Sequence, residues 1–87
     1  MAIIVEFFGV PRLRTGVSRL VIAARTVAEA LRALESACPV LSGSVVTQGV
    51  LAPHYRLNRN GTEFVEDPDA PLCDGDSLLI IAADAGG

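Results

Sequence analysis

The stretch that decides the fold is DGDSLLIIAADAGG, residues 74–87. Residues 74–76 are typical of a tight turn, and residues 77–83 predict a strand. This strand is apolar along nearly its whole length, as strands in the middle of a sheet are. The segment IIVEFF, residues 3–8, has the same character and is ended by Gly9 and Pro11. We therefore expect the last strand to lie beside the first at the centre of one sheet.

The remaining strands are predicted on either side of this pair. Residues 18–23 form a second strand, which pairs with the first in a hairpin whose loop holds residues 12–15. Residues 55–59 alternate, with Tyr55 and Leu57 inward and Arg56 and Asn58 outward. Asn60-Gly61 is a strong hairpin signal, because a type I′ turn needs positive φ at both central residues. Residues 62–65 then return as a further strand.

A single main helix is predicted after the second strand. Thr26 and Glu29 form a capping box at its start, and Pro39 ends it. Its apolar residues recur at helical spacing: Val27, Ala30, Leu31, Leu34 and Cys38. Residues 40–53 are predicted as a loop with one short helical turn. Leu72 is expected to anchor a proline-rich crossing, residues 66–71, in the core.

One helix covers only one face of a sheet, so the other face stays partly bare. Glu6 and Ser77 mark the outward side of the two central strands. This parity assigns to the core Ile3, Val5, Phe7, Leu78 and Ile80. It assigns to the uncovered face Ile4, Phe8, Leu79 and Ile81. Apolar patches of this kind usually mark a partner surface, and we expect this one near the root of the C-terminal tail.

Composition narrows the function. The chain has 87 residues and a net charge of −3, which predicts one domain that does not bind nucleic acid. No apolar run approaches the roughly 20 residues of a membrane span, and no secretion signal is recognisable. Cys38 and Cys73 have no metal-binding spacing, so we expect reduced thiols, a cytoplasmic protein and no metal site.

Charge is divided unevenly along the chain. Residues 1–59 hold all seven arginines and three glutamates, a balance of +4. Residues 60–87 hold seven carboxylates and no base, a balance of −7. Because the glycines belong to this acidic part, the sequence predicts electrostatic steering of the tail toward a basic partner surface. A solvated acidic face is the simpler interpretation.

The terminal glycines carry the functional hypothesis. We expect a domain over residues 1–83 and a flexible tail of Asp84, Ala85, Gly86 and Gly87. Glycine has no Cβ, so such a tail enters a slot that excludes other residues. The carboxylate of Gly87 has no side chain to shield it. A frayed tail with no role is the alternative.

Three segments carry a family resemblance: TVAEAL at 26–31, PLCDGD at 71–76 and AGG at 85–87. In this order they resemble the ubiquitin-like β-grasp sulfur carriers. Those carriers include the small subunit of molybdopterin synthase and the carriers of the thiamin and cysteine pathways. The resemblance implies an α+β fold with a mixed sheet of about five strands and one main helix on one face. Many members have a proline near Ala82, which is absent here, so the pathway stays open.

The resemblance also implies a reaction cycle. An E1-like activating enzyme would consume ATP to adenylate Gly87, and a sulfur donor would convert the adenylate to a thiocarboxylate. The sulfur would pass to a biosynthetic enzyme or to a synthase large subunit. The carrier itself would be no enzyme and would bind no cofactor. Two alternatives remain: a modifier joined through Gly87 to lysines of other proteins, and a plain interaction domain.

Overall fold

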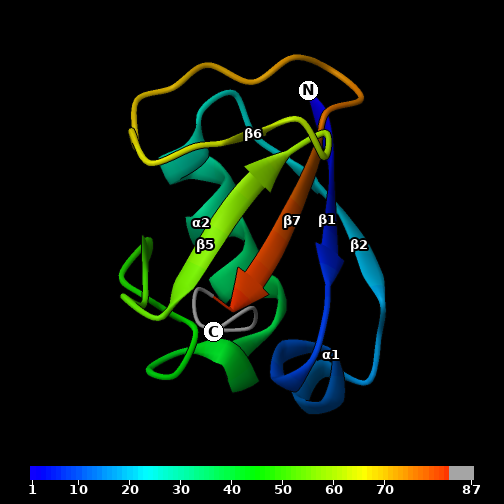
Figure 1. Cartoon of the computed structure of the whole chain (residues 1–87), viewed down its shortest axis with the longest axis vertical. Coiled ribbons are helices and arrows are strands. Elements are labelled where there is room, and N and C mark those ends of the chain that lie inside the picture. The colour runs from blue at the N-terminus through cyan, green and yellow to red at the C-terminus, as the bar shows by residue number, and fades with distance from the viewer. Residues whose placement is uncertain (83–87) are drawn as a thin grey trace.

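A five-stranded mixed sheet is the frame of the molecule, with the strand order β2-β1-β7-β5-β6 (Figure 1). Its strands are β1 (Ala2–Phe7), β2 (Arg19–Ala23), β5 (Tyr55–Arg59), β6 (Glu63–Phe64) and β7 (Ser77–Ala82). The two central strands, β1 and β7, are parallel, and the other neighbours are antiparallel. The prediction that the last strand lies beside the first is confirmed. The computed structural model describes residues 1–82; Ala83 and the expected tail, residues 84–87, lie outside the described residues.

The main helix, α2 (Val27–Ala37), begins at the predicted capping box. The backbone N–H of Glu29 donates to Thr26 Oγ1 at 3.3 Å. The Glu29 carboxylate reaches back and accepts from the backbone N–H of Arg25 at 3.1 Å. These bonds satisfy N–H groups that have no partner within the first helical turn. They fix the start of the helix, whose buried face then packs on the sheet.

The core lies between α2 and one face of the sheet, as the parity argument predicts. The five residues assigned to the core are all buried: Ile3, Val5, Phe7, Leu78 and Ile80. The anchor at Leu72 is also buried, and its N–H donates to the carbonyl of Arg25 at 2.8 Å. That bond holds the crossing, residues 66–71, against the start of α2. The architecture is the expected α+β arrangement of five strands and one main helix.

The hairpin between β5 and β6 turns at Asn60-Gly61, as predicted. Both residues have positive φ, 57° for Asn60 and 72° for Gly61. The predicted alternation of β5 agrees with the register, but one outward residue is buried. Asn58 shares the outward side with Arg56, yet only 8% of it is exposed. Asn58 pairs with Leu79 of β7 on one side and with Phe64 of β6 on the other. The burial that these neighbours cause cannot be predicted from the sequence of β5 alone.

The prediction of a plain loop at residues 12–15 is wrong. A short helix, α1 (Val10–Thr15), fills most of the connection between β1 and β2. Gly9 precedes it with φ 62°, and Gly16 ends it in the left-handed conformation with φ 75°. A one-and-a-half-turn helix shows no periodicity, and Gly9 and Pro11 are typical of a turn. The caps rather than the helical residues determine this element.

The prediction for residues 40–53 missed a small β-ribbon. After a 3₁₀ turn, η1 (Pro39–Leu41), the strands β3 (Val46–Thr47) and β4 (Val50–Leu51) pair antiparallel. The carboxylate of Glu35, on α2, accepts hydrogen bonds from the Ser42 hydroxyl at 2.7 Å and from the Gly49 N–H at 3.1 Å. The helix thus holds the ribbon through Glu35, which is distant in sequence from Gly49.

Candidate functional site

The turn at residues 74–76 fixes where β7 starts. Asp76 Oδ2 accepts from the Cys73 N–H at 2.9 Å, and Asp76 Oδ1 accepts from Asn60 Nδ2 at 3.1 Å. The bond from Cys73, then the bond from Asn60, lower the pKa of Asp76. The N–H of Gly75 donates to the carbonyl of Ala2 at 2.8 Å. The turn therefore locks β7 to the beginning of β1 and to the β5–β6 hairpin.

The position where β7 starts also determines at which end of the sheet β7 finishes, before residues 83–87. Because β1 and β7 are parallel, their carboxyl ends lie at the same edge, and α1 follows β1 there (Figure 1). Ala82 ends β7 opposite Tyr55. The six residues of β7 span about 20 Å, so the root of the tail is far from the turn at 74–76.

The uncovered face of the sheet holds the predicted partner-binding residues. Ile4, Leu79 and Ile81 are half-buried, and Phe8 is exposed. The strand register places these residues near one another. Ile4 on β1 pairs with Ser77 on β7, and Leu79 follows Ser77 two residues later on the same face. Leu79 itself lies between Glu6 of β1 and Asn58 of β5. The face assignment is confirmed for Ile4, Leu79 and Ile81, whereas Phe8 follows the end of β1 and has no strand partner. Their role in binding remains a prediction.

Two further residues on this face, Val21 and Phe64, were not singled out from the sequence. Val21 pairs with Ile4 and is exposed, and its outward parity was readable from β2. Phe64 is exposed beside Asn58, and the Arg56 guanidinium lies 5.7 Å from the centre of its ring. Phe64 belongs to a two-residue strand, which is too short to show alternation. The Oδ1 atom of Asn58, the strand partner of Phe64, is buried and accepts no hydrogen bond from the described residues.

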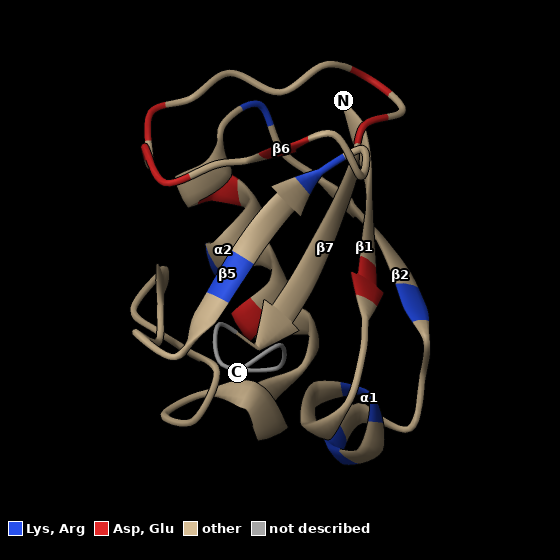
Figure 2. Ribbon diagram, viewed as in Figure 1, with Lys and Arg blue, Asp and Glu red and all other residues tan. Residues whose placement is uncertain are grey.

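Most of the acidic residues in the last third of the chain lie far from the tail root. The carboxylates between Glu63 and Asp76 gather around the β5–β6 turn, the crossing and the start of α2 (Figure 2). That is the opposite end of β7 from Ala82. At the tail-root end, α1 contributes Arg12 and Arg14, and β5 contributes Arg56. Neighbours in sequence are here separated in space, because β7 carries the chain across the whole sheet.

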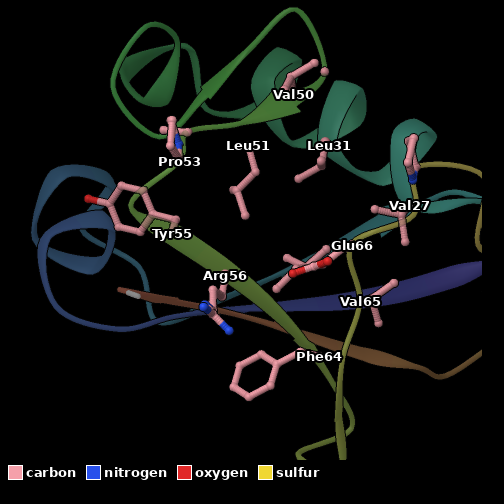
Figure 3. A pocket seen from close by; sticks show the side chains of 14 residues that line it. Val27, Leu31, Val50, Leu51, Pro53, Tyr55, Arg56, Phe64, Val65 and Glu66 are labelled. Carbon is pink, nitrogen blue, oxygen red and sulfur yellow. The ribbon is translucent and has the colours of Figure 1, made fainter. Parts of the chain in front are cut away.

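A groove of about 360 Å³ lies between α2, the β3–β4 ribbon and the edge of β5. Its wall is mostly apolar, with Leu31 and Leu51 on one side of β5 and Arg56 and Phe64 on the other (Figure 3). Glu66 adds one carboxylate. Within residues 1–82, no cluster of His, Cys, Asp or Glu has a geometry suited to a metal ion. None of the helices in that range is long and apolar enough to cross a membrane.

The two cysteines are unpaired and lie apart. Cys38 is half-buried at the end of α2, and burial raises the pKa of its thiol. Cys73 is exposed just before the turn at 74–76. Cys38 packs against the hydrophobic core, and a raised pKa favours the protonated, less reactive form of a thiol.

Comparison with known proteins agrees with this architecture. The small archaeal modifier protein 3 of Haloferax volcanii is 34% identical over 64 residues, which are 71% of this chain and 70% of that protein. The crystal structure of SAMP1 from Haloferax volcanii superposes with a TM-score of 0.84 at 26% identity, over 100% of both chains. A chain of the BexX/CysO complex from Amycolatopsis orientalis gives 0.81 at 28% identity, over 99% of this chain and 100% of that one.

The family model named ThiS family matches residues 5–87, nearly the whole chain. The match includes the five-stranded sheet except the first three residues of β1, the turn at 74–76 and the terminal glycines. The chain therefore belongs to the ThiS family, and its fold is that of the ubiquitin-like β-grasp sulfur carriers that its sequence resembles.

Proposed function

We propose that this chain is a sulfur carrier whose Gly87 carboxylate is converted to a thiocarboxylate. The observation that carries the proposal is the family match, which runs through Gly87. The rigid domain would serve as a handle, recognised by each enzyme that acts on the tail. The two unpaired cysteines suit a reducing compartment such as the cytoplasm.

The chemistry needs activation from outside the chain. A terminal carboxylate has a pKa of about 3.5, so it is an anion at neutral pH and a poor electrophile. An E1-like enzyme would join Gly87 to the AMP part of ATP and release pyrophosphate. Hydrosulfide would then attack the acyl carbon, and AMP would leave with the bonding electrons. The product is a thiocarboxylate, and no oxidant or reductant is consumed.

The domain supports this role by where it exposes apolar surface. The uncovered face and the end of β7 are continuous, because Ile81 is the last residue but one of β7. An enzyme that takes in residues 83–87 can therefore also cover Ile81 and Phe8. Such docking area adds affinity that a free tetrapeptide lacks.

Intact-mass measurement tests the proposal. The full chain is incubated with ATP, sodium sulfide and the E1-like enzyme of its own organism. We expect the chain to gain the mass difference between one sulfur and one oxygen atom. A chain lacking Gly87 should stay folded and gain nothing. Loading of that shortened chain, or no loading of the intact one, would refute the assignment.

Conjugation to other proteins is the second candidate. The relative of 34% identity is called a modifier protein, which favours this role. This chain has no lysine, so it offers no side-chain amine for chains of itself. Covalent adducts between Gly87 and lysines of other proteins, in the same incubation with cell extract, would support conjugation. Sulfur loading without adducts supports the carrier alone.

A further inference from the structure

Exposed apolar side chains gather around α1, at the tail-root end of the sheet. Phe8, Val10, Leu13 and Val17 are all exposed, and Leu13 is 82% exposed. Val40, on the neighbouring η1, is exposed as well. Single exposed apolar residues are ordinary, but a group of them within ten residues is typical of an interaction surface.

The helix that presents Leu13 is firmly built. Pro11 is buried beneath it, and the Leu13 N–H donates to the Gly9 carbonyl at 3.1 Å. Thr15 Oγ1 donates to the Pro11 carbonyl at 2.9 Å and accepts from the Val17 N–H at 3.3 Å. These bonds close both ends of a six-residue helix that would not persist alone. The fold thus holds Leu13 in one position in water.

Positive charge surrounds the exposed leucine. Arg12 and Arg14 flank it, and both are exposed. Neither is in an ion pair with any residue from 1 to 82, where the ion pairs are Arg25–Glu29 and Arg59–Glu63. The carboxylates of residues 63–76 lie at the other end of the molecule (Figure 2). A partner that complements this surface needs acidic groups around an apolar hollow.

We propose that Leu13, Arg12 and Arg14 form a docking knob for the E1-like activating enzyme, which receives Leu13 in an apolar hollow with an acidic rim. The inference rests on the proposed function. It follows from position, because α1 stands at the edge where β7 ends and any enzyme that takes in residues 83–87 approaches that edge (Figure 1). The sequence alone predicted a basic partner surface, whereas a docking knob with two arginines requires an acidic one.

Steady-state kinetics of ATP–pyrophosphate exchange by the activating enzyme test the knob. Leu13→Ala keeps a good helix former and should raise the KM for the carrier about tenfold with kcat unchanged. Leu13→Met should restore most of the affinity, since methionine fills an apolar hollow. Arg14→Glu should raise KM at low salt, and the rise should shrink as salt screens the charges.

Arg25→Glu is the matched control, because it changes the same charge at the far end of the molecule, where Arg25 N–H meets Glu29. It should leave KM near the wild-type value. Equal effects of the Arg14 and Arg25 changes, or an unchanged KM for Leu13→Ala, would overturn the knob. An intact chain that supports neither exchange nor sulfur loading would instead overturn the proposed function. Thermal unfolding of each variant checks that the fold is kept.

Discussion

Asn60 performs two tasks at one residue. Its backbone φ of 57° lies in the left-handed region, which residues with a Cβ rarely adopt. Its side-chain oxygen accepts from the Ser77 N–H at 2.8 Å, and its Nδ2 donates to Asp76 at 3.1 Å. The turn type was readable from Asn60-Gly61, whereas these bonds to the start of β7 were not, because they join residues far apart in sequence.

Two substitutions at Asn60 separate these tasks. Asn60→Gly removes both side-chain bonds but keeps the positive φ, so we expect it to cost about 1 kcal/mol of folding free energy. Asn60→Ala adds backbone strain and should cost about 2–3 kcal/mol. Urea unfolding of the two variants measures the difference. If alanine is tolerated as well as glycine, strain at the turn plays no part.

At the scale of elements, Glu35 is the link between α2 and the β3–β4 ribbon. The Ser42 hydroxyl, then the Gly49 N–H, lower the pKa of this carboxyl below its ordinary value of 4.5. A carboxyl whose pKa is lower in the folded than in the unfolded state stabilises the fold above the unfolded pKa. That stabilisation disappears as the pH falls through the folded pKa. The ribbon should therefore loosen in acid.

Glu35→Gln tests this link. At pH 7 we expect a lower melting temperature than wild type, because the charge-assisted bonds to Ser42 and Gly49 are weakened. As the pH falls through the folded pKa, the two proteins should melt progressively closer together, since wild-type Glu35 then loses its charge. Circular dichroism melts over a series of acidic pH values measure the gap. Ser42→Ala should reproduce part of the effect, and a gap that does not change with pH would contradict it.

The open face of the sheet makes a sharper prediction through two adjacent residues of β7. Ile80 is buried in the core, whereas Ile81 is half-buried on the open face opposite Arg56. Ile81→Asp should keep the fold and raise the KM for the activating enzyme about tenfold. Ile80→Asp buries a charge and should unfold the domain. Melting curves and exchange kinetics check both, and unfolding of Ile81→Asp would count against a docking role.

Long-range pattern was readable from the sequence, and short elements were not. Apolar runs at residues 3–8 and 77–83 sufficed to place the central strands, and parity sufficed to divide their side chains between two faces. Two-residue strands such as β3 and β4 show no alternation, and their positive φ falls on Gln48 and Gly49 rather than on Asn-Gly. The helix α1, with its exposed Leu13, was hidden for the same reason.

For the whole molecule, the fold separates in space charges that are close along the sequence. The acidic residues precede Gly87 closely along the chain, but β7 carries the backbone about 20 Å away from them. Figure 2 shows the carboxylates of residues 63–76 near the turn at 74–76, and Arg12 and Arg14 on α1 at the tail-root end. This separation of charge would orient the carrier as it approaches an acidic partner, an effect on association rate more than on affinity.

The position of the core also predicts which C-terminal residues are needed for the stability of the fold. Among residues 1–82, every buried core residue lies between Ile3 and Ile80. We therefore expect a chain ending at Ala82 to have a free energy of unfolding within about 0.5 kcal/mol of that of the full chain. A chain ending at Ile80 also loses the pairing of residues 81 and 82 with Arg56 and Tyr55. Its free energy of unfolding should therefore be lower by about 2–3 kcal/mol. Urea unfolding of the three chains compares them. A large loss on removal of residues 83–87 alone would mean that the tail contributes to the folded body, and a tail held in this way would have to be released before any enzyme could act on Gly87.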